Sequence, residues 1–323
     1  MGTNQTQSVL YQAAHEALAA PSIFNTQPWA WTVYADRLEL RADRTRQLST
    51  TDTDGRLLTI SCGVALHHAM VAISGHRVTV SLLPDAADPD LFAVLSVAEL
   101  AMPDQLREQL RLAISRRRSD RRPFAKTPIE GRVLDRLTNA CTQQGAHFYL
   151  VPWHQMSTLA LAAVAVGALQ MSDPAYRVEL ADWTHRPPWS GDGVPTGTAV
   201  QRSPRRVPIR EFAPFGGEVM AAGLDNDFGS TYGVVYTDGD AARDWLIAGM
   251  SLSALLLTAT AAGLATAIIS DVTEEVTIRQ HIQAMLPSGR PQVAVRIGHP
   301  QPGLPPSTPR RPAEEGIRIA DGT

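Results

Sequence analysis

Apolar residues recur at helical spacing in several long segments of the chain and alternate with polar residues in several shorter ones. The first pattern predicts amphipathic helices, and the second predicts half-buried strands. We expect helices over residues 8–19, 56–74, 104–115, 129–144, 155–171, 243–262 and 274–285. We expect a hairpin over 29–40 that turns near Asp36, and strands over 77–83, 146–151, 232–236, 264–269 and 292–297.

Two parts of the chain share a pattern of an apolar helix, a glycine and a β-branched strand. Residues 57–80 match residues 245–268 at an offset of 245 − 57 = 188, and the helix at Val9 matches that at Val133 at 133 − 9 = 124. The second copy therefore carries about 188 − 124 = 64 additional residues. These offsets predict two fused, unequal halves, which we place at residues 1–112 and 113–323.

The additional residues fall in a segment, 173–230, that is rich in proline and glycine and lacks a clear helical or strand pattern. A connection of this length inside a compact domain is unusual unless it has a function. We interpret the segment as an insert or lid.

An uncharged stretch over 245–270 is long enough to span a bilayer, but serines and threonines interrupt it and no basic residues flank both ends. We therefore expect a buried helix followed by a buried strand.

The composition is that of an ordinary globular protein, with 44% hydrophobic and 19% charged residues. The net charge of −3 offers no general attraction for nucleic acid. Cys62 and Cys141 match no metal-binding spacing, and the first residues lack the basic and apolar regions of a signal peptide. We expect reduced thiols, a cytoplasmic protein, no metal site and no membrane or nucleic-acid partner.

A short polar loop between the first helix and the hairpin is the first candidate site, with the sequence Pro-Ser-Ile-Phe-Asn-Thr-Gln-Pro-Trp over residues 21–29. Its two prolines restrict the backbone, and Ser22, Asn25 and Gln27 offer donors and acceptors that suit the edge of a planar heterocycle. The alternative is a capping turn in which these side chains bond to the local backbone.

A second candidate is the basic run Arg-Arg-Arg-Ser-Asp-Arg-Arg over residues 116–122. Five guanidinium groups repel one another unless an anion balances them, and arginine suits forked recognition of phosphate. The alternative is a solvated basic loop. The pair Arg310 and Arg311 in the C-terminal tail is a third candidate for the same anion, with a frayed tail as its alternative.

Together, these motifs resemble those of the nitroreductase superfamily, in particular its Acg-like branch. Its phosphate motif Arg-Arg-Ser-x-Arg is matched at 117–121, and its flavin-ring loop Pro-Ser-x-x-Asn-x-Gln-Pro-Trp is matched at 21–29. The resemblance implies an α+β, nitroreductase-like fold made of two fused, unequal copies, and it implies FMN as cofactor. The residues that it implies in FMN binding are Pro21, Ser22, Asn25, Gln27, Arg117, Arg118, Ser119, Arg121, Gly263, Leu264, Ser270, Arg310 and Arg311.

Within this set the resemblance implies distinct roles. The arginines and Ser119 would neutralise the phosphate, and the side chains of the polar loop would bond to the pyrimidine edge of the ring. Backbone amides between Gly263 and Ser270 would stabilise negative charge on the ring. Each motif occurs only once, so we expect one flavin site per chain and a monomer that acts as a pseudo-dimer.

The implied activity is NAD(P)H-dependent reduction of a small aromatic acceptor of the nitro or quinone type, with no side chain needed as a catalytic acid. The alternative is a protein that binds or sequesters FMN with little turnover. That alternative rests on the insert, whose aromatic residues Trp183, Trp189 and Phe212 could cover the ring. A third possibility is the same fold without a flavin.

Overall fold

Two sheets form the framework of the chain in a computed structural model that describes residues 3–73, 75–100, 102 and 104–320. The five-stranded sheet has the order β3-β4-β2-β1-β9, and the four-stranded sheet has the order β5-β6-β8-β7. The strands of the first are β1 (Trp29–Val33), β2 (Arg37–Ala42), β3 (His76–Leu82), β4 (Leu91–Leu100) and β9 (Ile317–Ile319). Those of the second are β5 (His147–Leu150), β6 (Thr231–Thr237), β7 (Ala265–Ile269) and β8 (Arg290–Gly298).

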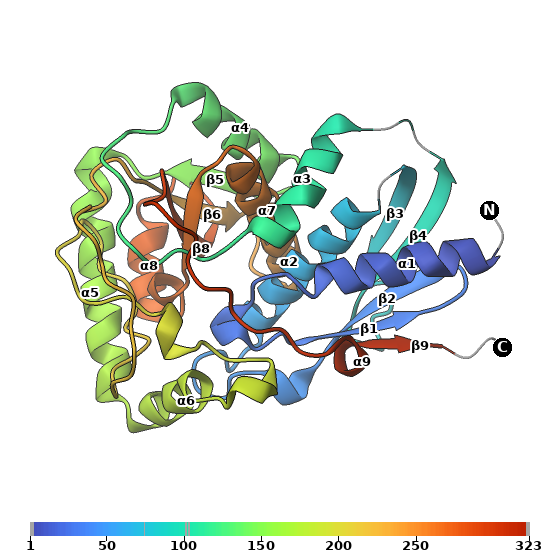
Figure 1. Cartoon of the computed structure of the whole chain (residues 1–323), viewed down its shortest axis with the longest axis horizontal. Helices are drawn as coiled ribbons and strands as arrows, with labels where there is room; N and C mark the ends of the chain where they lie inside the picture. The colour runs from blue at the N-terminus through green and yellow to red at the C-terminus, as the bar shows by residue number, and fades with distance from the viewer. Residues whose placement is uncertain (1–2, 74, 101, 103, 321–323) are drawn as a thin grey trace.

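The sheets are antiparallel apart from one pairing. The C-terminal strand β9 lies parallel to β1, and Ile317 faces Trp31 in the register. Figure 1 shows how this happens: the C-terminal segment crosses the molecule from the four-stranded sheet to the five-stranded one. Both termini therefore lie at the same end of the molecule.

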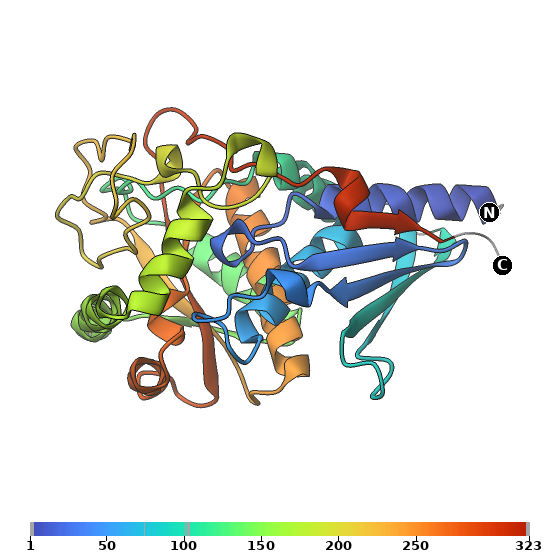
Figure 2. The same ribbon diagram turned by 90° about the horizontal axis from the view of Figure 1, so that it is seen from below.

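The helices are α1 (Thr3–Ala17), α2 (Arg56–Ala72), α3 (Gln105–Arg116), α4 (Gly131–Thr142), α5 (Met156–Ser172), α6 (Pro174–Thr184), α7 (Ala242–Ala261), α8 (Val276–Gln283) and the short α9 (Ala313–Gly316). Figure 2 shows α2 and α7 in the middle of the molecule, between the two sheets. Their apolar side chains belong to the largest buried cluster, which also takes in residues of both sheets. The α+β prediction is confirmed.

The contact between α2 and α7 is close because each helix presents a glycine to the other. A Cβ on Gly63 would lie 2.2 Å from the carbonyl oxygen of Leu246, and a Cβ on Gly249 would lie 2.0 Å from that of Ile60. The two contacts are reciprocal, since 246 − 60 and 249 − 63 both equal 186. Reciprocal contacts of this kind are those of an isologous, twofold interface.

Most predicted elements are present with ends shifted by a few residues, although Ser74 lies outside the described residues. The sequence reasoning missed β4, α6 and β9. β9 has only three residues and depends on its pairing with β1, so it carries no periodic pattern of its own.

Two helical segments, Trp153–Ser172 and Ala242–Ala261, are long and apolar enough to cross a bilayer by length and composition alone. The second contains α7, and most of it is buried against α2 and the two sheets. The expectation of a buried helix followed by a strand is confirmed for this stretch, because α7 leads into β7.

Candidate functional site

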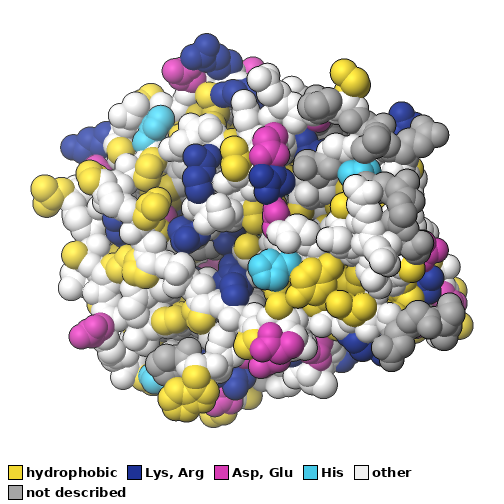
Figure 3. Space-filling view, turned by 45° about the vertical axis from the view of Figure 1, so that its right-hand side comes forward, with side chains coloured by type: hydrophobic (Ala, Val, Ile, Leu, Met, Phe, Trp, Pro, Cys, Tyr) yellow, Lys and Arg dark blue, Asp and Glu magenta, His cyan; other side chains and the backbone are white. Residues whose placement is uncertain are grey.

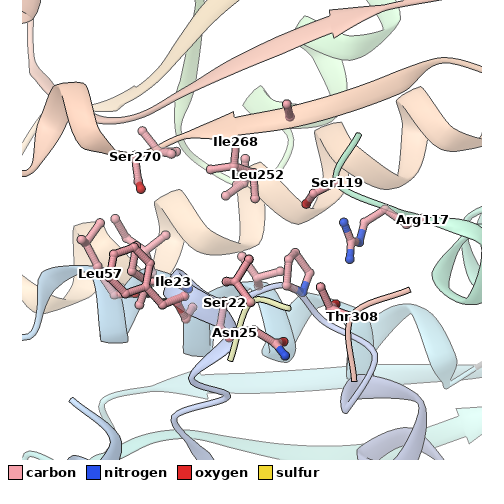
Figure 4. Close-up of a pocket in the computed structure, with 18 of the residues that line it drawn as sticks. Ser22, Ile23, Asn25, Leu57, Arg117, Ser119, Leu252, Ile268, Ser270 and Thr308 are labelled. Carbon is pink, nitrogen blue, oxygen red and sulfur yellow. Dashed lines mark hydrogen bonds between the residues drawn. The ribbon is translucent and has the colours of Figure 1, made fainter. Parts of the chain in front are cut away.

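A cavity that is partly open to solvent lies between the polar loop and α2 on one side and α7, β7 and the basic run on the other. Figure 4 shows Arg117, Ser119 and Thr308 toward one end of it, and Leu57, Ile23 and Ser270 toward the other. The cavity is lined by residues 21–25 of the polar loop, by α2 and α7, by the ends of β7 and β8, by the basic run and by the C-terminal tail. The sequence-predicted members of this lining are Pro21, Ser22, Asn25, Arg117, Ser119, Arg121, Ser270 and Arg310.

The polar loop has a strained backbone. Phe24, Asn25 and Gln27 have φ values of 45°, 55° and 50°, in a left-handed region that non-glycine residues rarely occupy. The hydroxyl of Ser22 accepts a hydrogen bond from the backbone N–H of Gln27 at 2.9 Å, and Ser61 of α2 accepts one from that of Ile23 at 3.1 Å. These bonds hold the loop in a conformation that local preferences disfavour, and so fix the wall of the cavity.

The basic end of the cavity contains guanidinium groups without carboxylate partners. Within the described residues, Arg117, Arg121 and Arg310 form no ion pair, and Nε and Nη1 of Arg117 and Nε of Arg310 are buried without a hydrogen-bond partner. Burial, followed by the charges of Arg310 and Arg118, lowers the pKa of Arg117 to about 9. Burial also lowers the pKa values of Arg121 and Arg310 to about 10. Unsatisfied buried cations of this kind suit an anionic ligand.

A fully buried arginine on β8 holds the basic run in place. Arg296 of β8 pairs with Asp227 at 2.7 Å and donates to the carbonyl oxygens of Asp120 and Arg122 at 2.8 and 2.9 Å. The N–H of Asp120 also bonds to the carbonyl oxygen of Thr266 in β7. The run is therefore an ordered extension of the four-stranded sheet, and the solvated-loop alternative is wrong for this segment.

Another cavity adjoins the basic end and includes Arg118 in its lining, together with Ser115, Ser307 and Thr308. It shares Arg117, Ser119, Arg121 and Arg310 with the main cavity. The four predicted phosphate-motif residues Arg117, Arg118, Ser119 and Arg121 thus surround one continuous polar region. Several basic side chains also lie close together near the middle of the face shown in Figure 3.

The proline-rich insert forms part of the cavity wall. Val194 and Phe212 line the cavity, and Trp183 packs beneath them in a cluster with Phe24. Trp189 is 84% exposed and takes no part in this cluster. The expectation that aromatic residues of the insert reach the site therefore holds for Phe212 and not for Trp189.

Asn25 and Gln27 attach the insert to the polar loop. Nδ2 of Asn25 donates to the carbonyl oxygens of Gly193 and Pro309, both at 3.0 Å, and Nε2 of Gln27 donates to that of Gly191 at 2.9 Å. The loop therefore serves as more than a local capping turn, because its side chains bond to segments more than a hundred residues away.

Five predicted site residues do not line the main cavity: Arg118, which lines only the adjoining one, and Gln27, Gly263, Leu264 and Arg311. Gln27 is 1% exposed and faces the insert and the tail. Gly263 lies just after α7, and Leu264 is in the core. Arg311 bonds to Gln27, Asp43 and Glu315 instead. Of the tail arginines, only Arg310 reaches the basic end, so the frayed-tail alternative is wrong at this position.

The structure also adds residues that the sequence reasoning did not single out. Leu57, Ile60 and Val64 of α2 and Leu252 of α7 supply an apolar wall, and Ser61 of α2 adds a hydroxyl. Their helical spacing predicted burial, but it could not separate a residue facing a cavity from one facing the core. Thr308 of the tail joins the basic end.

The chain thus combines an α+β fold with a cavity that is apolar along its walls and cationic at one end, a lining that suits a ligand with an apolar part and an anionic group. The chain belongs to the nitroreductase family: a sequence model described as Nitroreductase family matches residues 114–299. The predicted family, and with it the nitroreductase-like fold, is confirmed.

Relatives cover nearly the whole chain. A Mycobacterium tuberculosis protein named "Putative NAD(P)H nitroreductase Rv3131" is 38% identical over 91% of this chain and 87% of its own length. Another from that organism, "Putative NAD(P)H nitroreductase acg", is 32% identical over 98% of this chain and 97% of its own. Among solved structures, a nitroreductase-like family protein from Bacillus cereus aligns with a TM-score of 0.41 and 16% identity, over 70% of this chain and 100% of that one.

Proposed function

We propose that the chain binds one FMN in the cavity between its halves. The observation that carries the proposal is the cationic end of an otherwise apolar cavity, where Arg117, Arg121 and Arg310 have no carboxylate partner among the described residues. Nitrogens of Arg117 and Arg310 are buried there without a hydrogen-bond partner. A phosphate group would satisfy the orphaned nitrogens and offset the mutual repulsion of the three charges. The apolar walls from α2 and α7 would receive the ring system.

The residues divide into three groups by the part of FMN that they would contact and the half of the chain that supplies them. Arg117, Arg118, Ser119, Arg121 and Arg310 would hold the phosphate. Ser22 and the loop around it would meet the ring from the first half, and β7 with Ser270, which follows it, would meet the ring from the second. Since the side chains of Asn25 and Gln27 already bond to the insert and the tail, we assign both the positioning of this loop. Of the two, Asn25 lines the cavity and would also contact the ring edge.

We further propose that the activity is NAD(P)H-dependent reduction of small acceptors of the nitro or quinone type. FMN would supply the redox chemistry when bound. The chain would fix the ring between apolar side chains, exclude water through the insert, and place the end of β7 where negative charge develops. No side chain is assigned a catalytic proton transfer.

The insert favours a second candidate, an FMN-binding protein with little turnover. Val194 and Phe212 belong to the wall of the cavity. The insert is tied to the polar loop by two hydrogen bonds, from Asn25 to Gly193 and from Gln27 to Gly191, and the ion pair of Asp192 with Arg46 attaches it further. If this cover stays closed, neither a nicotinamide nor an acceptor can stack on the ring.

The reciprocal contact of α2 and α7 supports two related proposals. The halves would be residues 1–112 and 113–323, joined as a pseudo-dimer, and the chain would be a cytoplasmic monomer. The glycine contact already buries the kind of surface that a dimer would otherwise bury between two chains. Both cysteines are free and buried, in keeping with a reducing compartment.

The test is to purify the protein without added cofactor, record its visible spectrum and identify any released chromophore. We expect FMN at close to one per chain. NADPH added to the same sample bleaches the flavin rapidly if the protein is a reductase, and leaves it oxidised, with fluorescence protected from iodide, if the insert stays closed. A colourless protein that also fails to take up FMN would exclude both candidates.

A further inference from the structure

A second cavity lies beside the first, beneath the proline-rich insert. Its floor is formed by α5 and α6, through residues such as Ala163, Gly167 and Tyr176, and its roof is formed by residues 199–212 of the insert. Arg121 and Phe212 belong to the walls of both cavities, so a shared partition separates the two spaces.

Two arginines of the second cavity, Arg205 and Arg210, have hydrogen-bond donors that the described residues leave unused. Arg205 donates to the carbonyl oxygen of Arg121 at 3.0 Å and to the hydroxyl of Ser203 at 3.2 Å, neither of which is charged. Within the described residues Arg205 forms no ion pair. Arg210 pairs with Glu274 through Nη2, but its Nη1 is buried and has no partner. Both side chains thus have donors that an anion could use.

The charges of the lining favour an anion over a cation. Arg121, Arg202, Arg205 and Arg210 contribute four positive charges, and Glu211 and Asp271 contribute two carboxyl groups. Arg202 and Glu211 pair with each other at 3.0 Å and so cancel. Burial raises the pKa of Asp271 to about 6, so that this group loses part of its charge near neutrality. The net charge of the side chains that line the cavity is therefore positive.

Much of the remaining wall is apolar, although Gln170, Gln201 and Ser203 also line it. Ala163 and Val164 of α5, Met171, Ile209 and Phe212 supply hydrocarbon or aromatic surface next to the two arginines. A fully hydrated inorganic ion would leave this surface bare, whereas an organic anion would cover it and pair its charged group with the guanidinium groups.

We propose that the second cavity binds a small organic carboxylate with an apolar or aromatic body, whose carboxylate is held by Arg205 and by Nη1 of Arg210. Phe212 and Arg121, whose guanidinium carbon lies 4.2 Å from the centre of the Phe212 ring, form the partition between this ligand and the first cavity. The site is separate from the one assigned to FMN, and the proposal does not depend on flavin binding.

The test uses 4-fluorobenzoate as the probe and 4-fluorobenzamide, of nearly the same shape but neutral, as its counterpart. Binding of each to the purified full-length protein is followed by fluorine NMR. We expect the benzoate to bind at least about tenfold more tightly, because a charged hydrogen-bond pair is lost with the amide. Arg205→Gln should weaken the benzoate by about tenfold or more and leave the benzamide unchanged.

Arg206→Gln is the matched control. Arg206 is the next residue, but it stacks on Trp153 and Phe228 and does not line the cavity. It should bind benzoate as the wild type does. Equal loss in the two arginine variants, or equal affinity for benzoate and benzamide, would overturn the proposal.

A second variant tests the location without removing a charge. Gly167 lines the cavity and a Cβ there meets no atom within 4 Å, so the side chain of Gly167→Leu would begin in open space and fill part of the cavity. We expect it to abolish benzoate binding while the melting temperature and FMN content remain those of the wild type. Gly131→Leu, at a helical glycine with equally open surroundings outside the cavity, is the control. Benzoate binding that survives Gly167→Leu would place the ligand elsewhere, whatever the FMN content.

Discussion

Arg310 donates a hydrogen bond from Nη1 to the side-chain oxygen of Asn25 at 3.1 Å, across a separation of 285 residues. The same guanidinium group donates to the carbonyl oxygen of Ala19 at 3.0 Å through Nη2, and its Nε remains without a partner. The bond joins the loop proposed to meet the ring to the cation proposed to meet the phosphate. The two ends of one ligand would therefore be recognised by residues whose positions depend on each other.

The first prediction concerns the unpaired charge of Arg117. In Arg117→Met, FMN affinity should fall about 10- to 100-fold, because a charge-assisted contact to phosphate is lost. The flavin-free protein should be as stable as the wild type or more stable, by about 1 kcal/mol, since Arg117 is 5% exposed, lies near Arg310 and has no anionic partner. Flavin titration and urea unfolding of the flavin-free protein measure the two quantities.

Arg116→Met is the control for this variant, because Arg116 belongs to the same basic run, is exposed and does not line either cavity. Arg116→Met should change neither the FMN affinity nor the stability of the flavin-free protein appreciably. A loss of stability without a loss of FMN affinity in Arg117→Met would show that Arg117 has a structural role instead.

The second prediction concerns the close approach of α2 and α7. Gly249→Ala places a Cβ 2.0 Å from the carbonyl oxygen of Ile60, so the helices must separate. We expect a loss of about 3 kcal/mol or more in the free energy of unfolding, measured by urea denaturation. Gly167→Ala, in α5 with open space around its Cβ, should instead stabilise the protein by about 0.5–1 kcal/mol. Equal effects of the two substitutions would contradict a tight helix contact.

The third prediction is a pH dependence from Asp271. Burial raises its pKa to about 6 in the folded protein, although Arg210 opposes the shift, whereas the usual value is 3.8. Between these values the folded state binds more protons than the unfolded state, so this group's contribution to stability falls as the pH rises from about 4 to about 6. Asp271→Asn removes the carboxyl group, and with it this pH-dependent fall in stability. The stability of the variant relative to the wild type should therefore rise over this range and level off above it.

Thermal unfolding of both proteins across the range measures this difference. Asp52, whose pKa burial also raises to about 6, is present in both proteins, so its own pH dependence cancels. A difference that stays constant with pH would mean that Asp271 does not titrate in this window.

The fourth prediction concerns the insert. Asp192 pairs with Arg46, and the two side chains are 7% and 17% exposed. Asp192→Asn should weaken this attachment and raise the population of open insert by about tenfold, since breaking a mostly buried pair is costly. Limited proteolysis between residues 185 and 215 and iodide quenching of flavin fluorescence should both increase. In the control Asp182→Asn, where the side chain is exposed on α6, neither should change. Faster proteolysis with unchanged quenching would mean that the insert does not cover the flavin.

The periodic segments were predictable because their patterns are local. The helix that became α7 and the strand that became β7 were expected within a few residues, and the polar loop and basic run were recognised as candidate sites from their composition and order. A helix or strand with one buried face repeats its apolar residues at a fixed interval, which the sequence displays directly. Family membership followed from motifs of the same local kind.

Only the tertiary structure decided which of these residues meet. Arg310 joins the basic end while its neighbour Arg311 turns to Asp43 and Glu315, and no local pattern separates two adjacent arginines. Gln27 was expected at the ring edge but is buried against the insert and the tail. The second cavity exists only because residues 199–212 fold back over α5. Such contacts join segments far apart in the chain, and their energies depend on packing that sequence periodicity does not encode.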